Sequence, residues 1–158
     1  MNRLKLWSNY ALVYLMWVVS LGLWVLFMLI SRNTLAGLLD TFYLNGTFRR
    51  MKVAELIDLT YMFIIAAVGI VFMILVEYYF RRGVEKGDLI KRIGWVVGTL
   101  ILFIFLCDIT LALLIGFSQI IWWRWPVLLI ELTAGFGLIW LAIKGPSLTR
   151  PWQKKNFD

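Results

Sequence analysis

The chain has 158 residues, of which 62% are hydrophobic and 16% charged, and its formal net charge is +7. A soluble domain is only about 45–50% apolar, so a mean hydropathy of +0.84 excludes an ordinary soluble domain and indicates a protein that lives in lipid. The chain has no histidine and one cysteine, which excludes the usual zinc sites, histidine-based catalytic triads and cysteine-ligated iron–sulfur clusters. We therefore expect one membrane domain over residues 1–158 that is not an enzyme and binds no cofactor or metal.

The first apolar stretch runs from about residue 10 to residue 30 and carries no charge. At about 1.5 Å per helical residue, it is long enough to cross the roughly 30 Å of hydrocarbon in a bilayer. Arg3 and Lys5 precede it as in a signal peptide, but about 20 apolar residues exceed the 7–15 of a signal-peptide core. The pattern favours a membrane anchor that is retained.

The connection from residue 31 to residue 58 is the sizeable segment outside the predicted spans. Apolar residues recur in it at helical spacing behind Thr34, whose hydroxyl suits an N-cap; they are Leu35, Leu38, Leu39 and Phe42. This pattern predicts a short amphipathic helix that lies flat on the outer interface. Asn45 and Gly46 favour a turn before the second span, although Asn45-Gly46-Thr47 also fits a glycosylation sequon.

Two further spans are predicted over residues 59–80 and 93–117. A short polar connection with two glycines joins them, which predicts a helical hairpin. The fourth span begins near Pro126, because proline is tolerated in a first helical turn, and ends near residue 143, before Gly145 and Pro146. The predicted fold class is an all-α integral membrane protein, a four-transmembrane-helix up-down bundle with the short amphipathic helix between helices 1 and 2.

Lysine and arginine are unevenly divided between the two sides of this topology. Of the sixteen, eleven lie on the side of the chain termini and five on the other. The larger group is Arg3, Lys5, Arg81, Arg82, Lys86, Lys91, Arg92, Lys144, Arg150, Lys154 and Lys155, and the smaller is Arg32, Arg49, Arg50, Lys52 and Arg124. Because basic loops resist translocation, both termini should face the cytoplasm. A basic inner face also contacts anionic lipid. The positive net charge is therefore explained without a nucleic acid as a partner.

Charged side chains inside lipid cost about 2.5–3.5 kcal/mol at a helix centre, so each acidic residue in a span needs an explanation. Glu77 lies near the inner end of the second span with Arg81 one turn later, a spacing that favours an interfacial salt bridge. Asp58 lies at the outer end of the same span, within reach of Lys52, Arg50 or water. We interpret both acids as interfacial residues.

Asp108 and Glu131 lie deeper, at similar depth in the third and fourth spans, about 12 and 9 Å from the outer helix ends. At 100° per residue, each shares a helix face with small residues. The face of Asp108 includes Gly94 and Gly98, and the face of Glu131 includes Gly135. Because small residues let helix backbones approach closely, both acids should point into protein and away from lipid.

Three interpretations of this acidic pair compete. In the structural one, neutral carboxyls hydrogen-bond across the bundle to polar side chains, with Thr110, Thr133, Ser20 and Gln119 as candidates. In the second, the acids meet a cation or donor of another subunit, because no intramembrane lysine or arginine is evident within this chain. In the third, they form a path for protons or cations.

The first span also carries an aromatic stripe along a single helical face, which includes Tyr10, Tyr14, Trp17 and Trp24. Such a stripe can contact a quinone, a pigment or lipid tails. Large apolar side chains that face lipid or a neighbouring helix produce the same pattern, so the stripe alone does not identify what it contacts.

These patterns favour a non-catalytic small integral membrane subunit, an accessory or scaffold protein that holds partner helices or lipids in a larger membrane complex. Energy-transducing complexes commonly carry such subunits. The expected partners are other integral membrane subunits and membrane lipids, with a homo-oligomer as a further option. The alternative function is a homo-oligomeric transporter or channel that uses Asp108 and Glu131.

Overall fold

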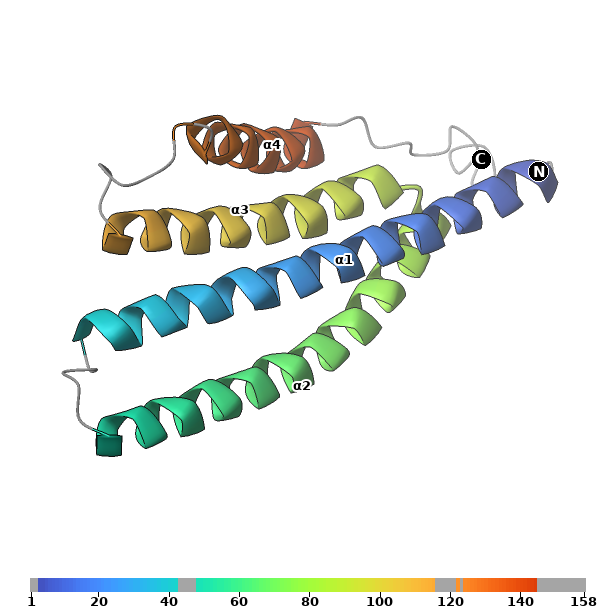
Figure 1. Cartoon of the computed structure of the whole chain (residues 1–158). Coiled ribbons are helices and arrows are strands. Elements are labelled where there is room, and N and C mark those ends of the chain that lie inside the picture. Colours follow the sequence, from blue (N-terminus) through green and yellow to red (C-terminus); the bar gives the residue numbers. More distant parts are fainter. Residues whose placement is uncertain (1–2, 43–47, 116–121, 123, 145–158) are drawn as a thin grey trace.

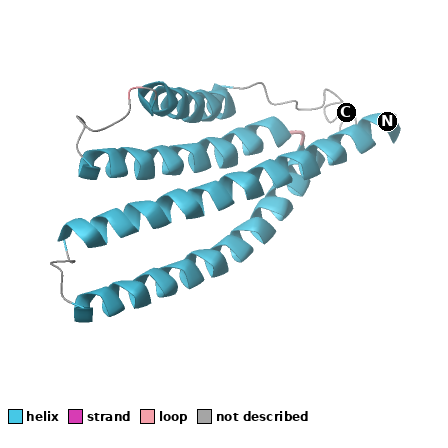
Figure 2. Ribbon diagram, viewed as in Figure 1, coloured by secondary structure: helices cyan, strands magenta, loops and turns pink. Residues whose placement is uncertain are grey.

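The computed structural model describes residues 3–42, 48–115, 122 and 124–144, and these residues are almost entirely helical (Figure 1, Figure 2). They form the helices α1 (Arg3–Phe42), α2 (Phe48–Lys86), α3 (Leu89–Ile115) and α4 (Arg124–Lys144). Each of the four is long and apolar enough to cross a membrane. The chain is thus an all-helical, multi-pass membrane protein.

Helix α1 is longer than the first predicted span and includes the segment that the sequence assigns to a separate helix. It runs through 40 residues without interruption, so the prediction of a short helix that starts behind Thr34 and lies flat is wrong. Thr34 is a buried mid-helix residue, and its hydroxyl donates to the carbonyl of Ile30 at 3.0 Å. The helix continues because no proline interrupts it and because Gly37 packs against Leu111 and Leu114 of α3.

Helices α2 and α3 form a hairpin whose connection is tighter than the sequence predicts. Gly87 has a φ of 75°, a left-handed conformation that glycine adopts without strain. The amides of Gly87 and Asp88 donate to the carbonyls of Val84 and Gly83 at 3.4 and 3.0 Å, which are the two hydrogen bonds of a Schellman cap. Most of the polar connection is therefore helical.

Consecutive helices run in opposite directions, and they follow one another across the molecule in the order α4, α3, α1, α2 (Figure 1). Helices α1, α2 and α3 contact one another, whereas among the described residues α4 contacts α3 alone. The main apolar core lies where the first three helices converge, and it contains Val13, Val76, Phe80 and Leu89. Helix α4 is thus attached to one side of a three-helix group. The connection between α1 and α2, with the predicted turn and sequon at residues 45–47, lies outside the described residues.

Candidate functional site

The structure brings Gly94, Gly98 and Gly135 together at the contact between α3 and α4. A Cβ atom on Gly94 would lie 2.8 Å from the carbonyl oxygen of Leu138, and one on Gly98 would lie 3.0 Å from the carbonyl oxygen of Gly135. A larger residue at either position therefore has to push the two backbones apart. The three glycines join two helices of the same chain.

Asp108 is buried on α3, with 7% of its surface exposed. Its Oδ1 atom lies 3.3 Å from Nη2 of Arg124, the first residue of α4. This pair corrects the expectation that the chain offers no lysine or arginine to the intramembrane acids. Counting along the chain gives no signal for this pair, because Asp108 lies seven residues before the end of α3 at Ile115, whereas Arg124 is the first residue of α4. The pairing depends on how far the two helices are shifted along each other.

Glu131 lies seven residues after Arg124 on the same helix. Its Oε2 atom is buried and has no hydrogen-bond partner among the described residues. Asp108 and Arg124 are thus paired with each other, and Glu131 is a further acid on α4.

The hydroxyl groups expected to serve the two acids bond elsewhere. Ser20, Thr110 and Thr133 each donate to the carbonyl four residues earlier in their own helix, at 2.7–2.9 Å. Serine and threonine in helices are commonly satisfied in this way. Gln119 lies outside the described residues. The prediction that these hydroxyls hydrogen-bond to the two acids across the bundle is therefore wrong. Asp108 instead forms an ion pair with Arg124.

A second ion pair joins α1 to α2. The guanidinium of Arg32 donates to both carboxylate oxygens of Asp58, at 2.9–3.2 Å. Asp58 was expected to reach Lys52, Arg50 or water, so its arginine partner on α1 is a correction. Arg32 lies in the predicted connection between the first two spans, whereas the uninterrupted α1 places it on a helix beside α2.

The two ion pairs lie at one level of the molecule. The hydroxyl of Thr34 shares its one hydrogen between the carbonyl of Cys107 on α3, at 3.1 Å, and the carbonyl of Ile30 within α1, at 3.0 Å. Thr34 follows Arg32 by two residues, and Cys107 precedes Asp108, so this contact aligns the α1–α2 pair with the α3–α4 pair. We term this set the polar layer; it consists of Arg32, Asp58, Thr34, Asp108 and Arg124.

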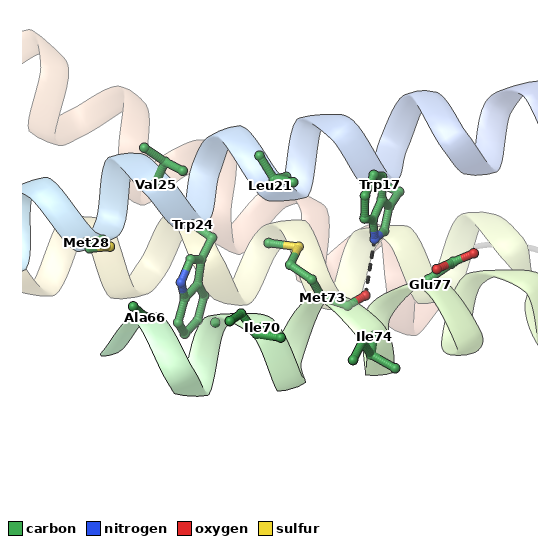
Figure 3. A pocket seen from close by; sticks show the side chains of 11 residues that line it. Trp17, Leu21, Trp24, Val25, Met28, Ala66, Ile70, Met73, Ile74 and Glu77 are labelled. Carbon is green, nitrogen blue, oxygen red and sulfur yellow. Dashed lines mark hydrogen bonds between the residues drawn. The ribbon is translucent and has the colours of Figure 1, made fainter. Parts of the chain in front are cut away.

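Trp17 and Trp24 of the aromatic stripe on α1 point toward α2 (Figure 3). The indole Nε1 of Trp17 donates to the carbonyl of Met73 at 3.1 Å. The ring of Trp24 stacks on Phe72, with centroids 4.8 Å apart, and occupies the space that Gly69 leaves free. Tyr10 is half-buried near the start of α1. Trp17 and Trp24 are thus contacts within the protein.

These aromatic side chains leave a groove of about 380 Å³ between α1 and α2, with apolar walls and with Glu77 at one end (Figure 3). The carboxylate of Glu77 lies 2.6 Å from Arg81, which confirms the predicted salt bridge. Arg81 also donates to the hydroxyl of Tyr14 at 2.6 Å. The charges at this end of the groove are therefore already paired.

In the described ranges, no group of three or more acidic or cysteine side chains is arranged to hold a metal ion. Comparisons with protein-family models, with curated proteins and with solved structures gave no match.

Proposed function

We propose that this protein is a non-catalytic integral membrane subunit, an accessory or scaffold protein that holds partner helices or lipids in a larger membrane assembly. The observation that supports this best is the engagement of the buried Asp108 by Arg124 of its own chain. An acid that moves protons or cations has to exchange its partner in each cycle, whereas a fixed ion pair suits an acid that holds two helices together.

In this proposal the four helices cross the membrane up and down, with both termini in the cytoplasm, as the distribution of lysine and arginine favours. Helix α4 contacts α3 alone among the described residues, and its other faces carry exposed apolar side chains such as Leu129, Ile130 and Phe136. These faces are the surfaces offered to partner helices or lipid.

Native electrophoresis in mild detergent, followed by mass spectrometry of the co-migrating proteins, tests the subunit role. We expect a discrete assembly that contains other integral membrane proteins in fixed ratio to this chain. A monomer, or an assembly of this chain alone, would contradict the proposal.

The orientation is tested with single cysteines in a Cys107→Ser background and a reagent that does not cross the membrane. Asn45→Cys should be labelled from outside intact cells, and Lys86→Cys and Lys155→Cys should not. Labelling of either lysine position would reverse the proposed topology.

A homo-oligomeric transporter or channel is the second candidate, and one observation favours it: the buried Oε2 atom of Glu131 has no partner among the described residues. In reconstituted vesicles, Glu131→Gln and Asp108→Asn should leave ion permeability unchanged if the protein is a scaffold. Proton-coupled flux that Glu131→Gln abolishes, at unchanged expression and oligomeric state, would reject the scaffold and establish the transporter.

A further inference from the structure

A second groove, between α2 and α3, is lined mainly by aromatic side chains and has a volume of about 440 Å³. We term it the α2–α3 groove; its rings are those of Trp24, Phe72, Tyr79, Trp95 and Phe103. Its volume lies within the range of about 300–1,000 Å³ that is typical of sites for small molecules. The groove has room for an apolar ligand.

Basic side chains lie at one end of this groove. On α3, Arg92 precedes the lining residues Val96, Thr99 and Phe103 by four, seven and eleven residues, a spacing that places all four on one helix face. On α2, Lys86 follows the lining residues Phe72 and Tyr79 by fourteen and seven residues and so continues their face, with Arg82 beside it, three residues after Tyr79. Both helices that form the groove therefore carry basic side chains at the end of the groove nearest the hairpin.

Arg92 is held in place by groups that do not neutralise it. Its guanidinium carbon lies 4.5 Å from the centroid of the Tyr79 ring, and its Nη1 donates to the carbonyl of Tyr79 at 2.9 Å. The Cδ atom packs over Gly83, where a Cβ would lie 2.9 Å away. These contacts place a cation beside a ring that lines the groove.

Arg92 differs in this respect from the arginines that bind carboxylates. Arg32, Arg81 and Arg124 each form a salt bridge. Among the described residues, no carboxylate lies within salt-bridge distance of Arg92, Arg82 or Lys86. The end of the groove therefore carries positive charge that an anion can neutralise.

The size of the groove suits a lipid chain better than a partner helix. From Trp95 to Phe103 it extends over about 12 Å of α3, which is close to the half of a roughly 30 Å hydrocarbon core that one leaflet occupies. A helix that crosses the membrane would need a groove more than twice as long. The cations lie on the side that the distribution of basic residues assigns to the cytoplasm, where anionic lipids gather.

We propose that the α2–α3 groove binds one acyl chain of an anionic phospholipid from the cytoplasmic leaflet, with the phosphate against Arg92 and with Arg82 and Lys86 nearby. This site deepens the lipid-holding part of the proposed function and rests on it. The aromatic walls exclude water from the acyl chain, and the guanidinium supplies charged hydrogen-bond donors to the phosphate.

The test uses the purified full-length chain in mild detergent, titrated with phosphatidylglycerol or with phosphatidylcholine of the same acyl chains and followed by native mass spectrometry. Phosphatidylglycerol should bind more tightly. Arg92→Gln should weaken its binding about five-fold, the loss expected for one cation near the membrane surface, and should weaken phosphatidylcholine less, because the choline cation of that headgroup already neutralises its phosphate. The control is Arg81→Gln, whose cation is paired with Glu77 beside the other groove; it should change neither affinity by more than about two-fold.

Thr99→Trp distinguishes binding of the acyl chain from binding of the phosphate, because the larger side chain fills the groove and leaves the cations in place. It should weaken both lipids at an unchanged melting temperature; if this variant does not fold, Arg92→Gln alone decides. Equal affinity for the two lipids, no effect of Arg92→Gln, or displacement of phosphatidylglycerol by an equal concentration of inorganic phosphate would each overturn the site. This measurement needs no partner protein, so it is independent of the test of the subunit role. If the chain shows no preference for the anionic lipid but still co-purifies with partner proteins, the lipid site is rejected and the proposed subunit role stands.

Discussion

Two helix contacts in this molecule are built in opposite ways. Between α3 and α4, Gly94 and Gly98 bring backbone against backbone, so that a Cβ at Gly94 would come within 2.8 Å of a carbonyl oxygen. Between α1 and α2, Trp17 and Trp24 separate the backbones, and a groove of about 380 Å³ remains. Small residues thus give a contact set by the backbone, whereas large rings give one set by side chains. The first contact should tolerate change far less than the second.

The largest effect is expected for Gly98→Leu. The new side chain would meet Ile139 at 2.9 Å and the carbonyl oxygen of Gly135 at 3.0 Å, so it should lower the free energy of unfolding by about 3 kcal/mol. Thermal or denaturant unfolding in detergent, followed by circular dichroism, measures the change. The matched control is Gly137→Leu on α4, because a Cβ at Gly137 meets no atom within 4 Å. Equal destabilisation by the two variants would show that close packing does not hold α4.

A smaller effect is expected from the ion pair at the same contact. Arg124→Gln leaves the buried carboxylate of Asp108 without its cation and should destabilise the protein by about 2 kcal/mol. Asp108→Asn should cost less, because the side chain of Arg124 is 40% exposed and can turn to water. Unfolding of both single variants and of the double variant measures the coupling. Strictly additive effects would show that the two side chains do not stabilise the contact together.

The smallest effect is expected between α1 and α2. Trp17→Phe removes the hydrogen bond from Nε1 to the carbonyl of Met73, which is 3.1 Å long, and keeps most of the ring. We expect a loss of about 1 kcal/mol in the free energy of unfolding. Trp7→Phe serves as the control, since Trp7 is 77% exposed. A loss at Trp17 as large as that at Gly98 would remove the contrast between the two contacts.

Local spacing predicted part of this structure well. The four apolar segments correspond to four helices that can cross a membrane, and the pair of Glu77 and Arg81 followed from residues one helical turn apart. The length of α1 could not be predicted in this way, because Thr34 also suits a helix start. Its place in mid-helix depends on packing against α3.

The long-range ion pairs depend on the register between helices, which no local pattern records. Arg32 and Asp58 are 26 residues apart, and Arg124 and Asp108 are 16 apart. Either pair can therefore be predicted only when the ends of both helices are known. The aromatic stripe shows a related limit. Its spacing identified one face of α1. It could not identify the helix that covers Trp24, because that contact is made by Phe72 and Gly69 on α2.

The polar layer has a consequence for the membrane in which this chain is most stable. Along α3, the helix from Arg92 near the α2–α3 hairpin to Asp108 in the layer is about 24 Å long, and along α1 the helix from Tyr14 to Arg32 is about 27 Å long. Ion pairs and the hydrogen bond from Thr34 to Cys107 hold the layer together, so its charges cannot move outward independently. The apolar segments of α1 and α3 continue past the layer, to Thr41 and Leu114. A bilayer that covers these segments buries the charges of the layer, which is costly, whereas a thinner hydrocarbon core leaves the layer at its edge. This difference should enrich the protein in membranes thinner than the roughly 30 Å of an average bilayer.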